Sequence, residues 1–201
     1  TGPIDTVLCH TDLDGLASAA KWLRGGIEPY PGCDDDARAI DTRIGVPSPV
    51  AEGFDRALRA RPNDESLLDL IVRHLERGLA SHEDAARIAA IADELIPIER
   101  ETERASRDYR CYDRRRGGSV AYLDITRGYG RVDKTELLLL SQKKAQVSVV
   151  VDEQNVLVAA PFDSGLNFLT LFGLDGGMPT RVSLPRKDLD RVLDGLGVDF
   201  V

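Results

Sequence analysis

Three residues near the start of the chain, His10, Asp12 and Asp14, stand at alternate positions that suit a metal site. In an extended segment, side chains at alternate positions point to the same side. Carboxylates with an imidazole suit a divalent ion such as Mn²⁺, and such an ion can generate a hydroxide that attacks a phosphodiester. A second interpretation stays open, in which Asp12 or Asp14 caps the helix that follows.

The elements around this stretch predict a small parallel α/β unit over residues 1–48. Residues 4–9 are predicted to form a buried strand, and a helical pattern follows the three candidate ligands. A second short strand is predicted over residues 37–40, with Asp41 at its end. The order strand, helix, strand is typical of a parallel pair joined by a helix.

The middle of the chain, residues 49–110, is predicted to be a helical connector. Apolar positions recur at helical spacing over residues 49–60, 65–77 and 82–107. Pro97 lacks a backbone N–H, so it is expected to kink or split the last of these helices. The length and charge of that helix would also allow it to mediate a homodimer.

The last part of the chain, residues 111–201, predicts a mixed sheet backed by helices. Its apolar segments follow one another in the order βαββαβα, with a hairpin over residues 146–161. The predicted fold class is therefore α/β, with a small N-terminal parallel unit, a helical connector and a C-terminal mixed sheet.

The composition predicts a folded, acidic protein. The 201 residues are 42% hydrophobic and 30% charged, with a net charge of -8. This charge disfavours duplex nucleic acid as a partner, whereas a small phosphorylated substrate or a short single-stranded oligonucleotide could bind at a local arginine cluster. Three cysteines without paired spacing predict free thiols in a reducing compartment. No apolar run is long enough to span a membrane, so a cytoplasmic location is expected.

The concentrated positive charge of the chain lies at Arg114, Arg115 and Arg116. The planar guanidinium group suits bidentate contact with phosphate, so these residues are candidate substrate contacts. The alternative is a solvated linker between the connector and the sheet. The residues alone leave both interpretations open.

Two parts of the chain resemble the DHH phosphoesterase superfamily. The stretch HTDLDGLASAA, residues 10–20, is similar to the first motif of that superfamily. The stretches SVAYLDI, VSVVVDEQNVLVAA and LNFLTLFGLDGGMPTRVSLP follow the layout of its associated C-terminal substrate domain. The resemblance implies hydrolysis of phosphodiesters or phosphoanhydrides with bound Mn²⁺.

This resemblance also assigns roles to individual residues. It implies that Asp41, as the strand-end aspartate of a second motif, joins the first-motif residues around Mn²⁺ or Mg²⁺ and acts with the two aspartates there in catalysis. Arg43 would then contact the substrate phosphate. Gly176 and Gly177, in the stretch that matches a glycine-rich substrate loop, would present backbone amides to the ligand.

Two functions remain open on the sequence. The first is a metal-dependent phosphoesterase acting on a small nucleotide or oligonucleotide. The second is a catalytically inactive binding or assembly module derived from the same fold. The Asp-His-His tripeptide of the family is absent from this chain, which favours the second function, whereas the retained His10, Asp12 and Asp14 favour the first.

Overall fold

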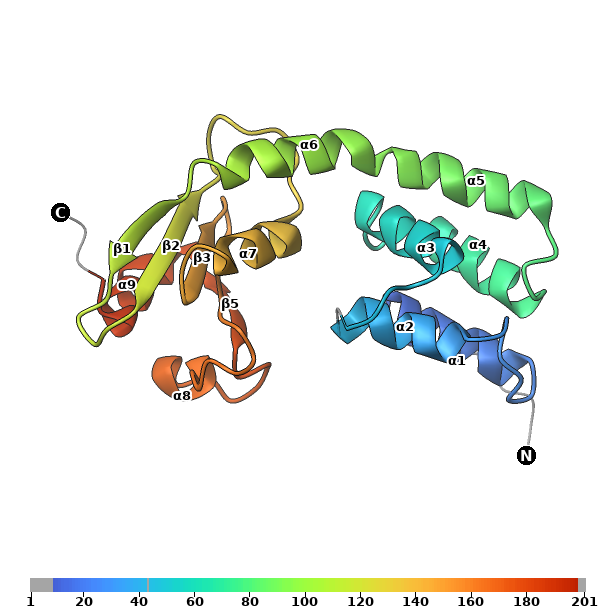
Figure 1. Ribbon diagram of the computed structural model, residues 1–201, viewed down its shortest axis with the longest axis horizontal. Coiled ribbons are helices and arrows are strands. Elements are labelled where there is room, and N and C mark those ends of the chain that lie inside the picture. The colour runs from blue at the N-terminus through green and yellow to red at the C-terminus, as the bar shows by residue number, and fades with distance from the viewer. Residues whose placement is uncertain (1–8, 43, 199–201) are drawn as a thin grey trace. The chain divides into compact units, whose positions relative to one another are not determined.

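The structure of the protein is a computed structural model that describes residues 9–42 and 44–198 (Figure 1). Its contacts divide the chain into two compact units, one ending at Pro97 and the other beginning at Ile98. We call them the helical unit and the sheet unit. Together they confirm the predicted α/β class. Among the described residues, no helix has the length and apolar character needed to cross a bilayer.

The described part of the helical unit consists of α-helices joined by turns. They are α1 (Leu13–Leu23), α2 (Cys33–Thr42), α3 (Pro49–Ala60), α4 (Glu65–Glu76), α5 (His82–Asp93) and the start of α6 (Leu95–Ser106). Several of these helices begin at a side-chain oxygen that accepts a hydrogen bond from a first-turn N–H, which stabilises the helix start. The capping residues are Asp12, Ser48, Asp64 and Ser81.

One apolar core joins α1, α3, α4 and α5. Leu16 of α1, Phe54 of α3 and Ile71 of α4 are all buried in it. Residues on both sides of the expected boundary at residue 48 therefore pack together in a single unit. A buried carboxylate also connects α2 to the start of α3, because Asp36 on α2 accepts a hydrogen bond from the backbone N–H of Ser48 at 2.7 Å.

The prediction of a second strand in the N-terminal parallel unit is wrong. Residues 37–40 lie inside α2. The alternation of Ala37, Arg38 and Ala39 fits a strand over three residues, but Ala37 and Ile40 also lie on one helical face. Three aspartates in the first turn favour the helix because negative charge stabilises a helix N-terminus. The other predicted strand, residues 4–9, lies outside the described residues except for Cys9, which is in no helix or strand.

The predicted break near Pro97 is confirmed. Helix α5 ends at Asp93 and α6 begins at Leu95, with Glu94 alone between them. Pro97 is the third residue of α6, where a missing N–H is tolerated because first-turn N–H groups have no partner inside the helix. The boundary between the two units falls within α6.

The sheet unit is built on a five-stranded mixed sheet with strand order β1-β2-β3-β4-β5. Its strands are β1 (Arg110–Asp113), β2 (Ser119–Asp124), β3 (Val147–Val151), β4 (Asn155–Ala159) and β5 (Arg181–Pro185). Strands β2 and β3 are parallel and are joined through α7 (Lys134–Gln142), whereas all other neighbouring pairs are antiparallel. The predicted order βαββαβα is confirmed from β2 onward, and β1 was not predicted.

Both faces of this sheet are covered by helices (Figure 1). On one face, Val149 packs in a core with α8 (Phe168–Phe172) and α9 (Leu189–Leu196), which follows the short 3-10 helix η1 (Arg186–Asp188). On the other face, Val150 packs with α7 and with Ala105 near the end of α6. Burial on both faces explains why every residue of β3 is buried and why all of them except Ser148 are valines.

Candidate functional site

The first-motif stretch folds as a capped helix start. Asp12 is the N-cap of α1, and its Oδ1 accepts a hydrogen bond from the backbone N–H of Gly15 at 2.9 Å. His10 is exposed, with its Nδ1 lying 3.9 Å from Asp12 Oδ2. Asp14 is exposed in the first turn of the helix. The capping interpretation of Asp12 is therefore confirmed.

Gly15 is required by the shape of this turn. A Cβ at position 15 would lie 2.4 Å from His10 O and 2.7 Å from His10 N. Only glycine allows the backbone to approach that closely without a shift. The glycine of this Asp-Gly pair is therefore explained by close contacts within the turn itself.

The expected metal ligands do not form a metal site in the part of the chain that the structure describes. Asp41 is exposed near the end of α2, because the segment before it is helical rather than a strand. Within the described ranges, no three His, Cys, Asp or Glu side chains gather in a way that could hold a metal ion. Arg43, the expected phosphate contact, lies outside the described residues. This donor set does not fit Mn²⁺ or Mg²⁺.

The arginine cluster lies in the turn of the β1–β2 hairpin, so its interpretation as a linker is wrong. Arg114 Nε donates to Leu196 O at 3.0 Å, and Arg115 N donates to Gly197 O at 2.9 Å. These bonds seat the turn on the C-terminal end of α9, where positive charge is favourable. Arg116 is exposed and forms no hydrogen bond or ion pair with the described residues.

A hollow of about 530 Å³ opens beside this turn. Its lining includes Arg114, Arg116, Gln146 and Asn167, and we call it the arginine hollow. The hollow lies wholly within the sheet unit, and the apolar ring of Phe168 forms part of its wall. Two of the predicted substrate contacts therefore meet at one concave surface.

The polar side chains of the arginine hollow leave donor groups for a ligand. Gln146 Oε1 accepts a hydrogen bond from Arg114 Nη1 at 3.3 Å, and Asn167 Oδ1 accepts one from Thr170 N at 3.1 Å. With both amide oxygens engaged, the two amide N–H₂ groups remain as donors. Gly118 permits this packing, because a Cβ there would lie 2.2 Å from Gln146 Oε1.

The charge of the arginine hollow differs from that of the chain as a whole. Of the residues that the structure describes, no acidic one lines it, although the net charge of the protein is -8. Two guanidinium groups and two amide groups form a donor set that suits an oxyanion. Phosphate matches it well, because guanidinium groups can contact phosphate oxygens in pairs.

The predicted glycine loop does not join this hollow. Gly176 and Gly177 are exposed in the loop after α8, and neither lines the arginine hollow. Their neighbour Met178 lines a separate, more apolar hollow of about 150 Å³ together with Leu138 and Phe162. Gly177 has a φ of 119°, so the backbone itself favours glycine there.

Sequence reasoning did not find Gln146 and Asn167 as members of the site. Asn167 stands directly before a helix, and that position signals a capping role, which it does fulfil. Gln146 precedes a buried strand and carries no motif. Only the pairing of strands brings it to the arginine turn, so spacing along the chain could not have shown it.

Comparison with known proteins adds no relative. No protein-family model matches the chain, and no curated protein matches it. The resemblance to the DHH phosphoesterase superfamily therefore stays a prediction that rests on the quoted motifs.

Proposed function

We propose that the protein binds a small phosphorylated ligand, such as a nucleotide or a short single-stranded oligonucleotide, in the arginine hollow. The observation that carries this proposal is the donor-rich lining, which has two arginines and, within residues 9–42 and 44–198, no acidic residue, although the chain as a whole is acidic. Such a hollow attracts an anion locally while the surrounding negative charge disfavours an extended polyanion.

Arg116 is the residue on which binding depends most directly. Its guanidinium has no partner among the described residues, so it can turn its full set of donors toward a phosphate. Arg114 is held by Leu196 O and Gln146 Oε1, which fixes its position at the edge of the hollow. Because Arg114 is already ordered by these hydrogen bonds, it loses little side-chain freedom when a phosphate binds, and Arg116 can adjust to the position of the ligand.

Calorimetric titration with inorganic pyrophosphate and with a 5′-phosphorylated dinucleotide tests this proposal. We expect Arg116→Ala to weaken binding about tenfold, the usual effect of losing a charged hydrogen bond. Arg100→Ala is the matched control, because Arg100 is exposed on α6 and lines none of the hollows described. Equal weakening by both variants, or no binding of either probe to the unaltered protein, would contradict the proposal.

Hydrolysis of a small phosphorylated ligand is the second candidate function, and it rests on the resemblance of residues 10–20 to the first motif of the DHH phosphoesterase superfamily. The test is release of product from the same dinucleotide with and without Mn²⁺. Asp12→Ser keeps a capping oxygen but removes the carboxylate, and Asp14→Ala removes the other. Turnover that survives both changes, or no turnover at all, excludes these aspartates from catalysis.

A further inference from the structure

A second hollow of about 530 Å³ lies at the carboxyl end of β2 and shares no lining residue with the arginine hollow. We call it the tyrosine hollow. Its lining residues are Asp108, Arg110, Tyr122, Leu123, Asp124 and Tyr129. They come from the segment after α6, from the two strands of the β1–β2 hairpin and from the loop that follows β2.

Strand pairing places charges of opposite sign on one face at this hollow. Arg110 on β1 stands directly opposite Tyr122 on β2. Asp124 lies two residues further along β2, so it shares the face of Tyr122. Arg110 and Asp124 are thus diagonal neighbours, and such positions are about 7–8 Å apart in a sheet. Long side chains can span that separation, yet Arg110 and Asp124 form no ion pair with each other among the described residues, so both groups can reach a small ligand at this face.

Both of these charged groups have capacity left for a ligand. Asp124 Oδ1 is occupied, because it accepts hydrogen bonds from Thr126 N at 2.9 Å and Thr126 Oγ1 at 2.6 Å. Asp124 Oδ2 has only a loose contact with Arg186 at 3.8 Å. Arg110 forms no ion pair with any residue that the structure describes.

The remaining walls are held in place by aromatic contacts. Tyr129 donates a hydrogen bond to Asp108 Oδ2 at 2.6 Å, and the guanidinium of Arg104 lies 4.9 Å from the centre of its ring. The ring of Tyr122 meets that of Tyr112 edge to face, with their centres 6.4 Å apart. Tyr122 and Tyr129 are therefore each held by a neighbouring side chain.

We propose that the tyrosine hollow binds a free amino acid as its zwitterion. The carboxylate pairs with Arg110, and the ammonium group lies between Asp124 and Asp108. A simple cation would be repelled by Arg110, and a simple anion would be repelled by the two carboxylates. A zwitterion satisfies both signs at once, and the hollow is large enough to admit a side chain against the tyrosine rings.

The test is a titration of the full chain with glycine, L-alanine, L-leucine, L-phenylalanine and L-glutamate, each used singly and followed through backbone amide chemical shifts. We expect at least one of them to shift the amides around Arg110, Asp124 and Tyr129. The N-acetylated and carboxamide forms of the best binder should bind about tenfold more weakly, because each lacks one of the two charges.

Protein variants separate the two ends of the ligand. Arg110→Ala should weaken the amino acid about tenfold and leave its carboxamide form unchanged, and Asp124→Asn should do the same for the ammonium end. The amide introduced by Asp124→Asn keeps an oxygen that can accept from the backbone N–H of Thr126, so the turn is preserved. Arg100→Ala and Asp190→Asn are the matched controls, because both residues are exposed and line neither hollow.

Three results would overturn the proposal. The first is that no amino acid shifts these amides at millimolar concentration. The second is that the blocked forms bind as tightly as the parent ligand, and the third is that the control variants weaken binding as much as the site variants do. None of these results bears on pyrophosphate binding, so a failure here is distinguishable from a failure of the arginine hollow.

Discussion

The helical unit and the sheet unit use their polar side chains in different ways. In the helical unit the carboxylates of Asp12, Asp36 and Asp64 accept hydrogen bonds from backbone N–H groups and so hold helix ends and turns. In the sheet unit Arg116 and Asp124 stand at a hairpin turn and a strand end, and each borders a hollow. The three carboxylates of the helical unit hold helix ends and turns, whereas Arg116 and Asp124 of the sheet unit also border a concave surface.

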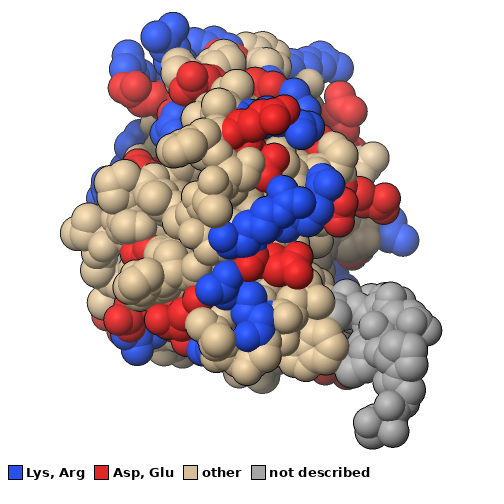
Figure 2. Space-filling view, turned by 90° about the vertical axis from the view of Figure 1, so that its right-hand side faces the viewer, with Lys and Arg blue, Asp and Glu red and all other residues tan. Residues whose placement is uncertain are grey.

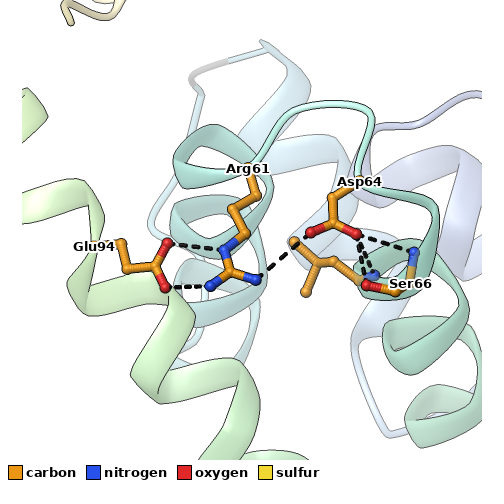
Figure 3. A network of polar contacts seen from close by, with 5 residues as sticks. Arg61, Asp64, Ser66 and Glu94 are labelled. Atoms are coloured by element: carbon orange, nitrogen blue, oxygen red, sulfur yellow. Dashed lines mark hydrogen bonds and ion pairs between the residues drawn. The ribbon is translucent and has the colours of Figure 1, made fainter.

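Many charged side chains at the surface of the protein likewise lie beside a charge of the opposite sign. Figure 2 shows basic and acidic side chains next to one another on the face that it draws. Figure 3 shows one such group, in which Arg61 Nε donates to Glu94 Oε2 at 2.8 Å while Arg61 Nη1 lies 3.6 Å from Asp64 Oδ2. Because these charges already neutralise each other, they attract a ligand less than the unbalanced lining of the arginine hollow does.

The largest expected effect on stability is confined to the sheet unit. Phe168 on α8 is fully buried in the core that α8 and α9 share with the sheet, and its ring centre lies 5.9 Å from that of Phe172. Phe168→Ala should lower the free energy of unfolding by about 3–5 kcal/mol, because it removes apolar burial and leaves a cavity. Urea unfolding measures this loss.

The matched control is Phe162→Ala, because Phe162 is 80% exposed. It should change stability by less than about 0.5 kcal/mol. Amide hydrogen exchange should show faster opening of the sheet unit with the helical unit unchanged in Phe168→Ala. An equal increase in the exchange rate of both units would show that they unfold together. The two units would then not differ in how this substitution changes their stability.

A pH-dependent loss of stability is expected in the helical unit. His74 on α4 is 3% exposed, and its buried Nδ1 has no hydrogen-bond partner. Burial lowers its pKa below the ordinary value of 6.5; Asp84 opposes this shift and Arg77 adds to it. Below that ordinary value the unfolded chain takes up a proton more readily than the folded one, so stability present at higher pH is lost as the pH falls.

Urea unfolding between about pH 7.5 and pH 5 measures this loss, since unperturbed carboxylates titrate below that range. His74→Gln should flatten the dependence, and His82→Gln should leave it unchanged because His82 is exposed. A slope that persists in His74→Gln would assign the effect to another group.

The smallest effect is expected at the exposed ion pair of Arg61 and Glu94, whose side chains are 42% and 45% exposed. Arg61→Ala should lower the urea midpoint slightly at low salt and not measurably at high salt, because exposed pairs are screened. Urea unfolding at two salt concentrations gives the comparison. A large loss that salt does not change would mean that this contact holds α3 against the α5–α6 junction far more strongly than its exposure suggests.

Much of the fold could be predicted because local signals are strong. The helices that begin at Pro49, Glu65 and His82 start where the apolar spacing predicted, the residues after β3 turn back as a hairpin, and Cys9, Cys33 and Cys111 are free thiols as expected. These features depend on a few neighbouring residues. The strand predicted over residues 37–40 failed because a run of four residues fits both the helical and the strand period.

The candidate sites were harder to predict because they depend on residues distant in the chain. Arg114 and Arg116 were predicted as phosphate contacts from residue type alone. Their partners Gln146 and Asn167 carry no motif that points to the same place. The opposite charges of Arg110 and Asp124 meet only through the register of β1 against β2.

The sequence by itself determined most helix starts, the hairpin and the order of helices and strands along the chain from β2 onward, because each depends on local hydrogen bonding or on the period of apolar residues. Only the tertiary structure decided which polar groups are bound to other parts of the protein and which line a hollow. The carboxylate of Asp12 is bound to a helix start, whereas Arg116 lines a hollow to which the described residues contribute no acidic side chain. The physical reason is that packing and strand register set the distances between residues, and charge acts over distance in space rather than along the chain.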